Sequence, residues 1–285
     1  MSSMEGDEGD LTRKQRREQA RAQRKALEEA EAANAMRRRR MTQLGGVVAV
    51  VVVAIVVILV ATGGGSKSGG LPKSKSEKNA TVAAISSLIG GIPQSGNALG
   101  SPTAPVTLKY FGDLECPICR EFTVEALPQI IPKWVRTGKL RIEYHSMSTA
   151  TGNAERDGSE PQEIFKSQQV AAYAAGKQDK GWNFIETFYH EQGEEDSGYV
   201  TEKYIQGIAS QIPGLNLAQW SSDRSDPELV NEIETDKQLA NNEGFTGTPS
   251  FLVGRSGGAM SKLEYTSSPG DPTFVDEAVE KLLKS

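Results

Sequence analysis

The stretch Val106-Thr107-Leu108-Lys109-Tyr110-Phe111-Gly112-Asp113-Leu114-Glu115-Cys116-Pro117-Ile118-Cys119 decides the fold of this 285-residue chain. Its first six residues alternate in polarity and are rich in β-branched and aromatic side chains, which predicts a β-strand over 106–111. A helical pattern of apolar residues follows the cysteines and runs to residue 135. The two cysteines therefore stand where a strand passes into a helix.

The chain after this stretch continues the alternation of helices and strands. Pro128 and Pro132 are expected to kink or divide the first helix. Residues 140–145 alternate again and predict a second strand, parallel to the first because a helix joins the two. The remaining expected elements are several helices within 160–243, interrupted at 193–197, 213–214 and 221–226, strands at 250–253 and 262–266, and a final helix that begins at Asp271-Pro272.

The two cysteines are the only ones in the chain, and they stand three residues apart. A disulfide between them closes almost no loop, so the spacing favours chemistry over structural cross-linking. A helix N-terminus stabilises a thiolate through its backbone N–H groups and its dipole. We therefore expect Cys116 to be the attacking sulfur, with Pro117 at the first helical position. Cys119, one turn further in and more buried, is expected to resolve the mixed disulfide.

Half of a zinc site is the alternative interpretation of the cysteine pair. Zinc commonly takes four ligands, and the other Cys or His ligands could come only from His145 and His190, whose spacing is not that of a zinc finger. The position after a strand favours redox chemistry. We expect no metal and no cofactor, and each histidine is expected to be a surface or packing residue.

Residues 44–61 form an uncharged apolar run. As a helix, this run crosses most of a hydrocarbon core that is about 30 Å thick. We predict an uncleaved transmembrane helix; a cleaved signal peptide is the alternative, which the small residues at 61–63 keep open and the long preceding segment disfavours. The cluster Arg37–Arg40 directly before the run places the N-terminus in the cytoplasm and the C-terminal body outside. Disulfides persist on that outer side.

Three further segments complete the expected domain organisation. Residues 1–43 hold eleven Lys and Arg against eight Asp and Glu, which predicts a charged cytoplasmic tail, helical or disordered. Residues 62–84 are rich in Gly, Ser and Lys and predict a flexible linker. Residues 85–285 form the outward domain, with a helical insertion at about 158–243. The net charge of −5 gives no sign of nucleic-acid binding.

Four stretches of this chain resemble the DsbA-like thioredoxin-fold oxidoreductases in their membrane-anchored form. They are Gly91–Asn97 with Leu99-Gly100, Ala104-Pro105-Val106, Phe111–Cys119 and Gly244-Phe245-Thr246-Gly247-Thr248-Pro249-Ser250-Phe251. The resemblance implies an α/β thioredoxin-like fold with a helical insertion over 85–285, preceded here by one transmembrane helix and a polar N-terminal helix or tail. It also implies that the Thr248–Pro249 bond is cis and packs against the cysteines, where Thr248 can present its backbone to a substrate segment. An ordinary proline at a strand entry is the alternative.

Two positions depart from the pattern of this family. Strongly oxidising relatives often have His before the second cysteine, where this chain has Ile118, which offers neither a donor nor a positive charge. The acid that many relatives place six residues before the first cysteine is Tyr110 here. Asp113 and Glu115 are then the candidates for proton transfer, although both are expected to be solvated loop charges.

The expected function is the formation of disulfide bonds in secreted or envelope proteins through Cys116 and Cys119, supported by Pro117, Ile118, Thr248 and Pro249. The expected partners are unfolded or thiol-containing extracytoplasmic proteins and a membrane quinone-linked protein that reoxidises the pair. The alternatives are a disulfide reductase or isomerase on the same scaffold and a non-catalytic peptide-binding envelope factor. No dimerisation module is visible, which counts against an isomerase.

Overall fold

A computed structural model of the chain describes residues 74–151, 161–195 and 197–284. The charged tail predicted at 1–43 and the transmembrane helix predicted at 44–61 lie outside the described residues. Within the described ranges, no helix has the length and apolar character that crossing a membrane requires.

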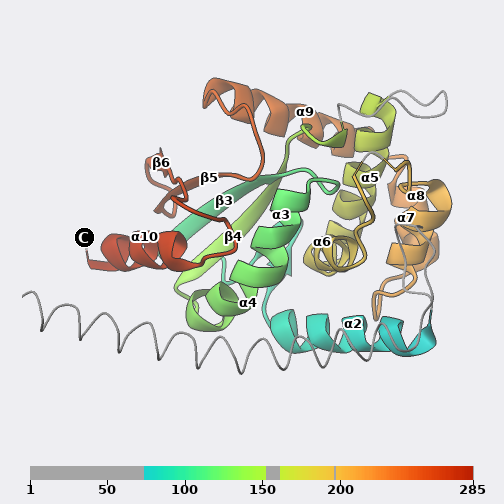
Figure 1. The fold of residues 1–285 in the computed structure, drawn as a ribbon, viewed down its shortest axis with the longest axis horizontal. Coiled ribbons are helices and arrows are strands. Elements are labelled where there is room, and N and C mark those ends of the chain that lie inside the picture. The colour runs from blue at the N-terminus through green and yellow to red at the C-terminus, as the bar shows by residue number, and fades with distance from the viewer. Residues whose placement is uncertain (1–73, 152–160, 196, 285) are drawn as a thin grey trace, which may run out of the picture. The chain divides into compact units, whose positions relative to one another are not determined.

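A six-stranded sheet in the order β1-β2-β4-β3-β5-β6 forms the centre of the described domain (Figure 1). Its middle is the pair of β3 (Val106–Gly112) and β4 (Leu140–Ser146), which run parallel as predicted. A strand buried on both faces is typical of such a central position, and only Lys109 of β3 is partly exposed. The other strands, all antiparallel to their neighbours, are β5 (Ser250–Arg255) beside β3, β6 (Met260–Lys262) beside β5, and the hairpin of β1 (Gln94–Ser95) and β2 (Ala98–Leu99) beside β4.

The last strand is shorter than predicted and begins earlier. We expected a strand over 262–266, but β6 covers Met260–Lys262. Leu263 N still donates to Phe251 O at 3.0 Å. Beyond this pair β6 would have to pair with Pro249, which directly precedes β5 and has no N–H group to donate. The pairing therefore stops, and the prediction for 263–266 is wrong.

The helical segment that follows the cysteines is divided, as Pro128 and Pro132 predicted. Each proline lacks the N–H group that an α-helix needs inside its hydrogen-bonded ladder, and the backbone widens into π-helical turns. The successive pieces are α3 (Pro117–Glu121), the π-helical η1 (Phe122–Ala126), α4 (Leu127–Ile130) and the π-helical η2 (Ile131–Val135).

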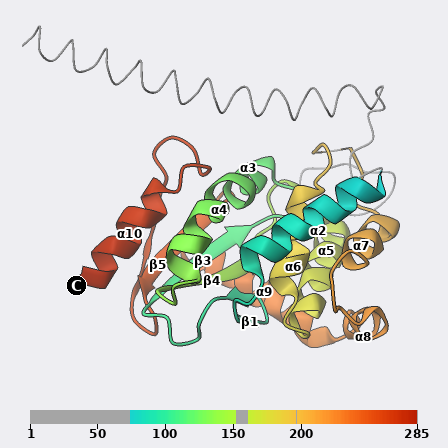
Figure 2. The same cartoon turned by 90° about the horizontal axis from the view of Figure 1, so that it is seen from below.

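Aromatic side chains hold this helical segment against one face of the sheet. The Tyr110 ring of β3 lies 4.9 Å from the Phe122 ring and 5.6 Å from the Phe251 ring, between centroids. Phe274, from the final helix α10 (Thr273–Lys284), lies 5.3 Å from Phe251. Figure 2 shows α10 and α4 together on this face of the sheet. Because the rings come from β3, η1, β5 and α10, their packing fixes the helix after the cysteines relative to the sheet.

Helices are inserted between β4 and β5, in the region that the sequence predicted. Those within 161–223 gather on the side of the sheet away from β6 and α10, whereas the last, 227–242, runs back over the sheet toward β5 and β6 (Figure 1). Their large side chains Trp182, Phe184, Phe188 and Tyr189 are fully buried, and Trp134 of η2 is only 6% exposed. The inserted helices are α5 (Pro161–Gly176), α6 (Gly181–His190), α7 (Glu202–Ala209), α8 (Leu217–Asp223) and α9 (Pro227–Asn242).

The folded domain begins before residue 85. The linker was expected to extend to residue 84, but its last part belongs to α2 (Lys75–Ile89). Ser74 and Glu77 form a capping box, in which each side chain accepts a hydrogen bond from the backbone N–H of the other. Ile85 and Ile89 are buried, and α2 packs against α6 and η2. A defined N-cap and an apolar face therefore make an ordered helix where composition suggested a tether.

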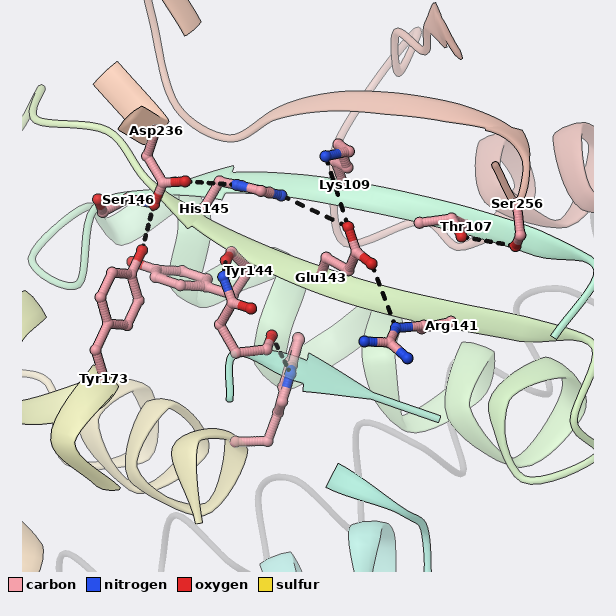
Figure 3. Close-up of polar contacts among 12 residues, drawn as sticks. Thr107, Lys109, Arg141, Glu143, Tyr144, His145, Ser146, Tyr173, Asp236 and Ser256 are labelled. Atoms are coloured by element: carbon pink, nitrogen blue, oxygen red, sulfur yellow. Dashed lines mark hydrogen bonds and ion pairs between the residues drawn. The ribbon is translucent and has the colours of Figure 1, made fainter. Parts of the chain in front are cut away.

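A line of charged side chains joins α9 to the other face of the sheet (Figure 3). Asp236 of α9 has its Oδ1 2.6 Å from His145 Nδ1, and its Oδ2 accepts hydrogen bonds from Ser146 N at 2.8 Å and from the Tyr173 hydroxyl. His145 Nε2 lies 3.8 Å from the Glu143 carboxylate. Since Ser146 ends β4, Tyr173 belongs to α5 and Asp236 belongs to α9, both ends of the insertion meet at one buried carboxylate.

The histidine in this line holds its proton more strongly than an ordinary histidine. Burial disfavours the imidazolium, but the hydrogen bonds with Asp236 and Glu143 outweigh burial and the opposing charge of Lys109, so the pKa of His145 is raised. The stability that protonated His145 contributes is complete below the unfolded-state pKa of about 6.5. It is lost as the pH rises through the raised pKa of the folded state.

Replacing this histidine is expected to cost more stability in acid than in base. His145→Gln should lower the free energy of unfolding by about 1 kcal/mol more at about pH 5.5 than at about pH 8.5, because a charged hydrogen bond contributes more than a neutral one. Urea unfolding of both proteins at the two pH values, followed by tryptophan fluorescence, measures this difference.

His190→Gln is the matched control. Burial and the Arg120 charge lower the pKa of His190, so its neutral form is the one that the folded state prefers. The stability lost in this variant should therefore be smaller at the lower pH, the reverse of the trend for His145. Equal losses at both pH values for His145→Gln would contradict the charged interaction with Asp236.

Candidate active site

Cys116 is the N-cap of α3. Its Sγ accepts a hydrogen bond from Cys119 N at 3.4 Å, and Pro117 occupies the first helical position. Both cysteines are free thiols. Cys116 is 6% exposed and Cys119 is 0% exposed. Cys116 is therefore the more exposed residue of the pair, in the order that the sequence suggested, although it is less accessible than a surface nucleophile.

The loop that precedes β5 lies against the first cysteine. The Thr248–Pro249 peptide bond is cis, as the resemblance implied, and Cys116 Sγ lies 3.5 Å from Thr248 O. Ile118, between the cysteines, is 42% exposed. The structure thus brings together all six residues that the sequence proposed for the site: Cys116, Pro117, Ile118, Cys119, Thr248 and Pro249.

The pKa values of the two cysteine thiols are shifted in opposite directions. The pKa of the Cys116 thiol is lowered from 9.0 to about 7. The hydrogen bond with the Cys119 thiol is the largest cause, and burial of Cys116 opposes it. The Thr248 side chain and the N–H groups of Cys119 and Ile118 lower the pKa further. Burial, followed by the hydrogen bond and charge of Cys116, raises the pKa of Cys119 well above its ordinary value. Near neutral pH, Cys116 is therefore partly a thiolate while Cys119 keeps its proton.

The uncharged phenol of Tyr110 lies against the second cysteine. The Tyr110 hydroxyl lies 3.3 Å from Cys119 O and 3.1 Å from the Tyr189 hydroxyl. Burial raises the pKa of Tyr110 well above its ordinary value, so the phenol stays neutral. Gly112 is required beside these rings, because a Cβ there would come 2.9 Å from a ring carbon of Tyr144 and 3.0 Å from the Tyr189 oxygen.

Asp113 and Glu115 are buried, so the expectation of solvated loop charges is wrong. Asp113 is 0% exposed and Glu115 is 1% exposed. The Asp113 carboxylate accepts hydrogen bonds from Thr149 N at 2.9 Å, from Thr151 N at 3.0 Å and from the Thr151 hydroxyl at 2.6 Å. Gln168 of α5 donates to Glu115 at 3.2 Å. The insertion and the loop after β4 cover both carboxylates, and Asp113 ties that loop to the one that carries the cysteines.

Two polar side chains of the site were missed in the sequence. Thr149 Oγ1 lies 2.5 Å from Thr248 Oγ1. Gln192, just after α6, donates to Leu114 O at 2.7 Å and to Cys116 O at 3.2 Å. Neither residue carries a local pattern, because only the pairing of β3 with β4 and the placement of the insertion bring them beside the cysteines.

The zinc interpretation gains no support from the histidines. His145 is engaged with Asp236, and His190 Nε2 lies 3.8 Å from Glu186. In the part of the chain that the structure describes, no group of three or more His, Cys, Asp and Glu side chains is arranged to hold a metal ion.

Comparisons with known proteins agree with this arrangement. A family model described as thioredoxin matches residues 94–261. The probable disulfide bond formation protein D of Bacillus anthracis is 23% identical over 188 residues, which is 66% of this chain and 78% of that protein.

Solved structures show the same fold. The oxidised BdbD of Bacillus subtilis superposes with a TM-score of 0.53 at 20% identity, over 68% of this chain and 97% of that one. The alpha-DsbA1 of Wolbachia pipientis gives a TM-score of 0.50 at 20% identity, over 66% and 90% of the two chains. Since the family model covers more than half of the sequence, this chain belongs to the thioredoxin family and has the helical insertion of the DsbA-like fold.

Proposed function

We propose that this protein is a membrane-tethered, extracytoplasmic thiol–disulfide oxidoreductase that forms disulfide bonds in secreted and envelope proteins. The enzyme class, thiol–disulfide oxidoreductase, follows from the family and from the cysteine pair. The names of the Bacillus relatives, disulfide bond formation proteins, favour the oxidising direction.

The main support for this proposal is that the pKa of Cys116 is lowered while the pKa of Cys119 is raised. A thiolate is the species that exchanges with disulfides and the better leaving group. With a pKa of about 7, Cys116 is a good leaving thiolate near neutral pH, while the proton of Cys119 stays in place. The same helix N-terminus therefore holds one sulfur that reacts as a thiolate, Cys116, and one that stays protonated, Cys119.

Exchange with a substrate dithiol then takes two steps. A substrate thiolate attacks Cys116 Sγ of the oxidised pair, the Cys116–Cys119 bond breaks, and Cys119 leaves and takes up a proton. The second substrate thiolate attacks the substrate sulfur of the mixed disulfide, and Cys116 leaves as the thiolate. Two electrons pass from the substrate to the enzyme, whose disulfide is replaced by one in the substrate.

The proposed location rests on the sequence before the described domain. The apolar run 44–61 is long enough to anchor the chain, and Arg37–Arg40 favour a cytoplasmic N-terminus. The domain that carries the cysteines would then lie outside, where new disulfides persist. A membrane quinone-linked protein is the proposed acceptor of the two electrons.

The reduction potential of the pair is expected to lie between those of thioredoxin, about −270 mV, and DsbA, about −120 mV. A pKa of about 7 for Cys116 stabilises the reduced form, whereas Ile118 supplies no further charge. Thiolate absorbance as a function of pH gives the pKa, and equilibration with glutathione gives the potential.

Ile118→His is the matched variant for this measurement. An imidazolium beside Cys116 favours the thiolate, so this variant should have a lower pKa for Cys116 and a more oxidising potential. A wild-type potential at or below that of thioredoxin would contradict an oxidase and indicate a reductase.

Removing the second sulfur is expected to trap substrates. In Cys119→Ala, no internal thiol can release a protein bound to Cys116, so mixed disulfides should accumulate in cells and disappear on reduction. Non-reducing gels followed by mass spectrometry identify the attached proteins. The double variant Cys116→Ala/Cys119→Ala should trap nothing; capture of the same proteins by this control would indicate a peptide-binding factor instead.

The proposed topology predicts where protease can reach the chain. Protease is added to cells in which the layers outside the plasma membrane have been opened and the plasma membrane is intact. It should remove the domain after residue 74 and leave an epitope within residues 1–43 protected. Detection of both parts by immunoblot checks this, with detergent lysis as the control. Protection of the domain together with the tail would contradict an outward-facing enzyme.

A further inference from the structure

Two threonine hydroxyls from different loops meet beside the reactive sulfur. Thr149, in the loop after β4, has its Oγ1 2.5 Å from Thr248 Oγ1, in the loop before β5. Thr248 lies against the reactive sulfur, since its backbone O is 3.5 Å from Cys116 Sγ, and the Thr248 side chain lowers the pKa of both cysteines. The two hydroxyls therefore lie next to each other beside the reactive sulfur.

Thr149 is held in this position by its own backbone. Its N–H donates to Asp113 at 2.9 Å, and the same carboxylate is bound by Thr151 N and the Thr151 hydroxyl. Asp113 is fully buried, so these hydrogen bonds are shielded from competing water. The Thr149 hydroxyl is thus placed by hydrogen bonds that its own side chain does not make.

When Cys116 is a thiolate, the number of available protons decides which hydroxyl donates each hydrogen bond. A hydroxyl has a single proton to donate. A hydrogen bond to a charged acceptor is about twice as strong as one between neutral groups, so the Thr248 proton points to the Cys116 thiolate. The contact of 2.5 Å between the two hydroxyls must then be made by the proton of Thr149.

We propose that Thr149 is a positioning residue of this active site: its hydroxyl donates to Thr248, and so directs the Thr248 proton to the Cys116 sulfur anion. Thr149 acts through Thr248 and does not itself touch the sulfur. Hydrogen bonds in a chain polarise one another, so the first donor strengthens the second. The pair supplies from two loops the donor that Ile118 does not provide.

This role concerns the second step of the proposed exchange, and it rests on the proposed function. When the second substrate thiolate attacks, the bond between the substrate sulfur and Cys116 breaks, and Cys116 receives the electron pair. Donors already aimed at that sulfur stabilise the charge that develops there. Thr149 therefore favours the release of oxidised substrate and the reduced state of the enzyme.

Thr149→Val tests the proposal, because valine keeps the shape and the backbone N–H and loses only the hydroxyl. The pKa of Cys116 should rise by about half a unit, and at about pH 8.5 the glutathione equilibrium should shift roughly threefold toward the enzyme disulfide. At about pH 5.5, where Cys116 is protonated in both proteins, the shift should vanish. Thr149→Ser, which restores the hydroxyl, should return both values to wild type.

Two further variants separate this role from a structural one. Thr137→Val removes a hydroxyl that donates to Lys133 O at 2.8 Å, and it should leave the pKa of Cys116 and the glutathione equilibrium unchanged. In a Thr248→Val background, Thr149→Val should have no further effect on the pKa, because its route to the sulfur is already gone. Urea midpoints of all variants show whether each is folded.

Three results would overturn the proposal. The first is an unchanged pKa of Cys116 in Thr149→Val. The second is a lowered pKa of Cys116 in that variant, which would mean that Thr248 donates to Thr149. The third is an effect of Thr149→Val on the pKa that persists in full in the Thr248→Val background. Each of these leaves disulfide exchange intact. A wild-type protein that fails to exchange with glutathione would instead contradict the proposed function itself.

Discussion

The antiparallel pairing of β3 with β5 is the constraint on which the site depends. Phe111, near the end of β3, pairs with Ser250 at the start of β5. The loop that leaves β3 and the loop that enters β5 must therefore emerge side by side, which puts Cys116 next to Thr248 across 132 positions of sequence. The parallel partner β4 ends at the same edge, where the loop with Thr149 meets both. The pairing of β3 with β4 and β5 thus brings three loops together around the sulfur of Cys116.

Much of the fold could be predicted because its signals are local. Alternating side chains marked β3 and β4, an apolar run marked β5, and the two prolines marked the division of the helix after the cysteines. Elements whose existence depends on distant partners could not be found this way. The hairpin of β1 and β2 has only two residues in each strand and exists because β4 offers it an edge. The end of β6 is set by Pro249, which directly precedes the neighbouring strand β5.

The site was predictable to the extent that its residues carry a motif. The cysteines and the Thr248–Pro249 pair stand in recognisable contexts, and the structure brings them together. Thr149 and Gln192 have no such context, since their roles arise from the folded arrangement alone. Asp113 and Glu115 were misjudged for the same reason: a carboxylate in a loop is normally hydrated, and no residue near either one in the sequence indicates that the loop after β4 and Gln168 of the insertion will bury them.

The meeting of both ends of the insertion at Asp236 has an evolutionary consequence. The helices between β4 and β5 leave the sheet beside Ser146 and return to the same place through α9. The segment between Tyr173 and Asp236 can therefore differ in number and length of helices while these two residues hold the distance between the flanking loops. Variation there changes the outer surface of the domain and leaves the pairing of β3 with β4 and β5 intact.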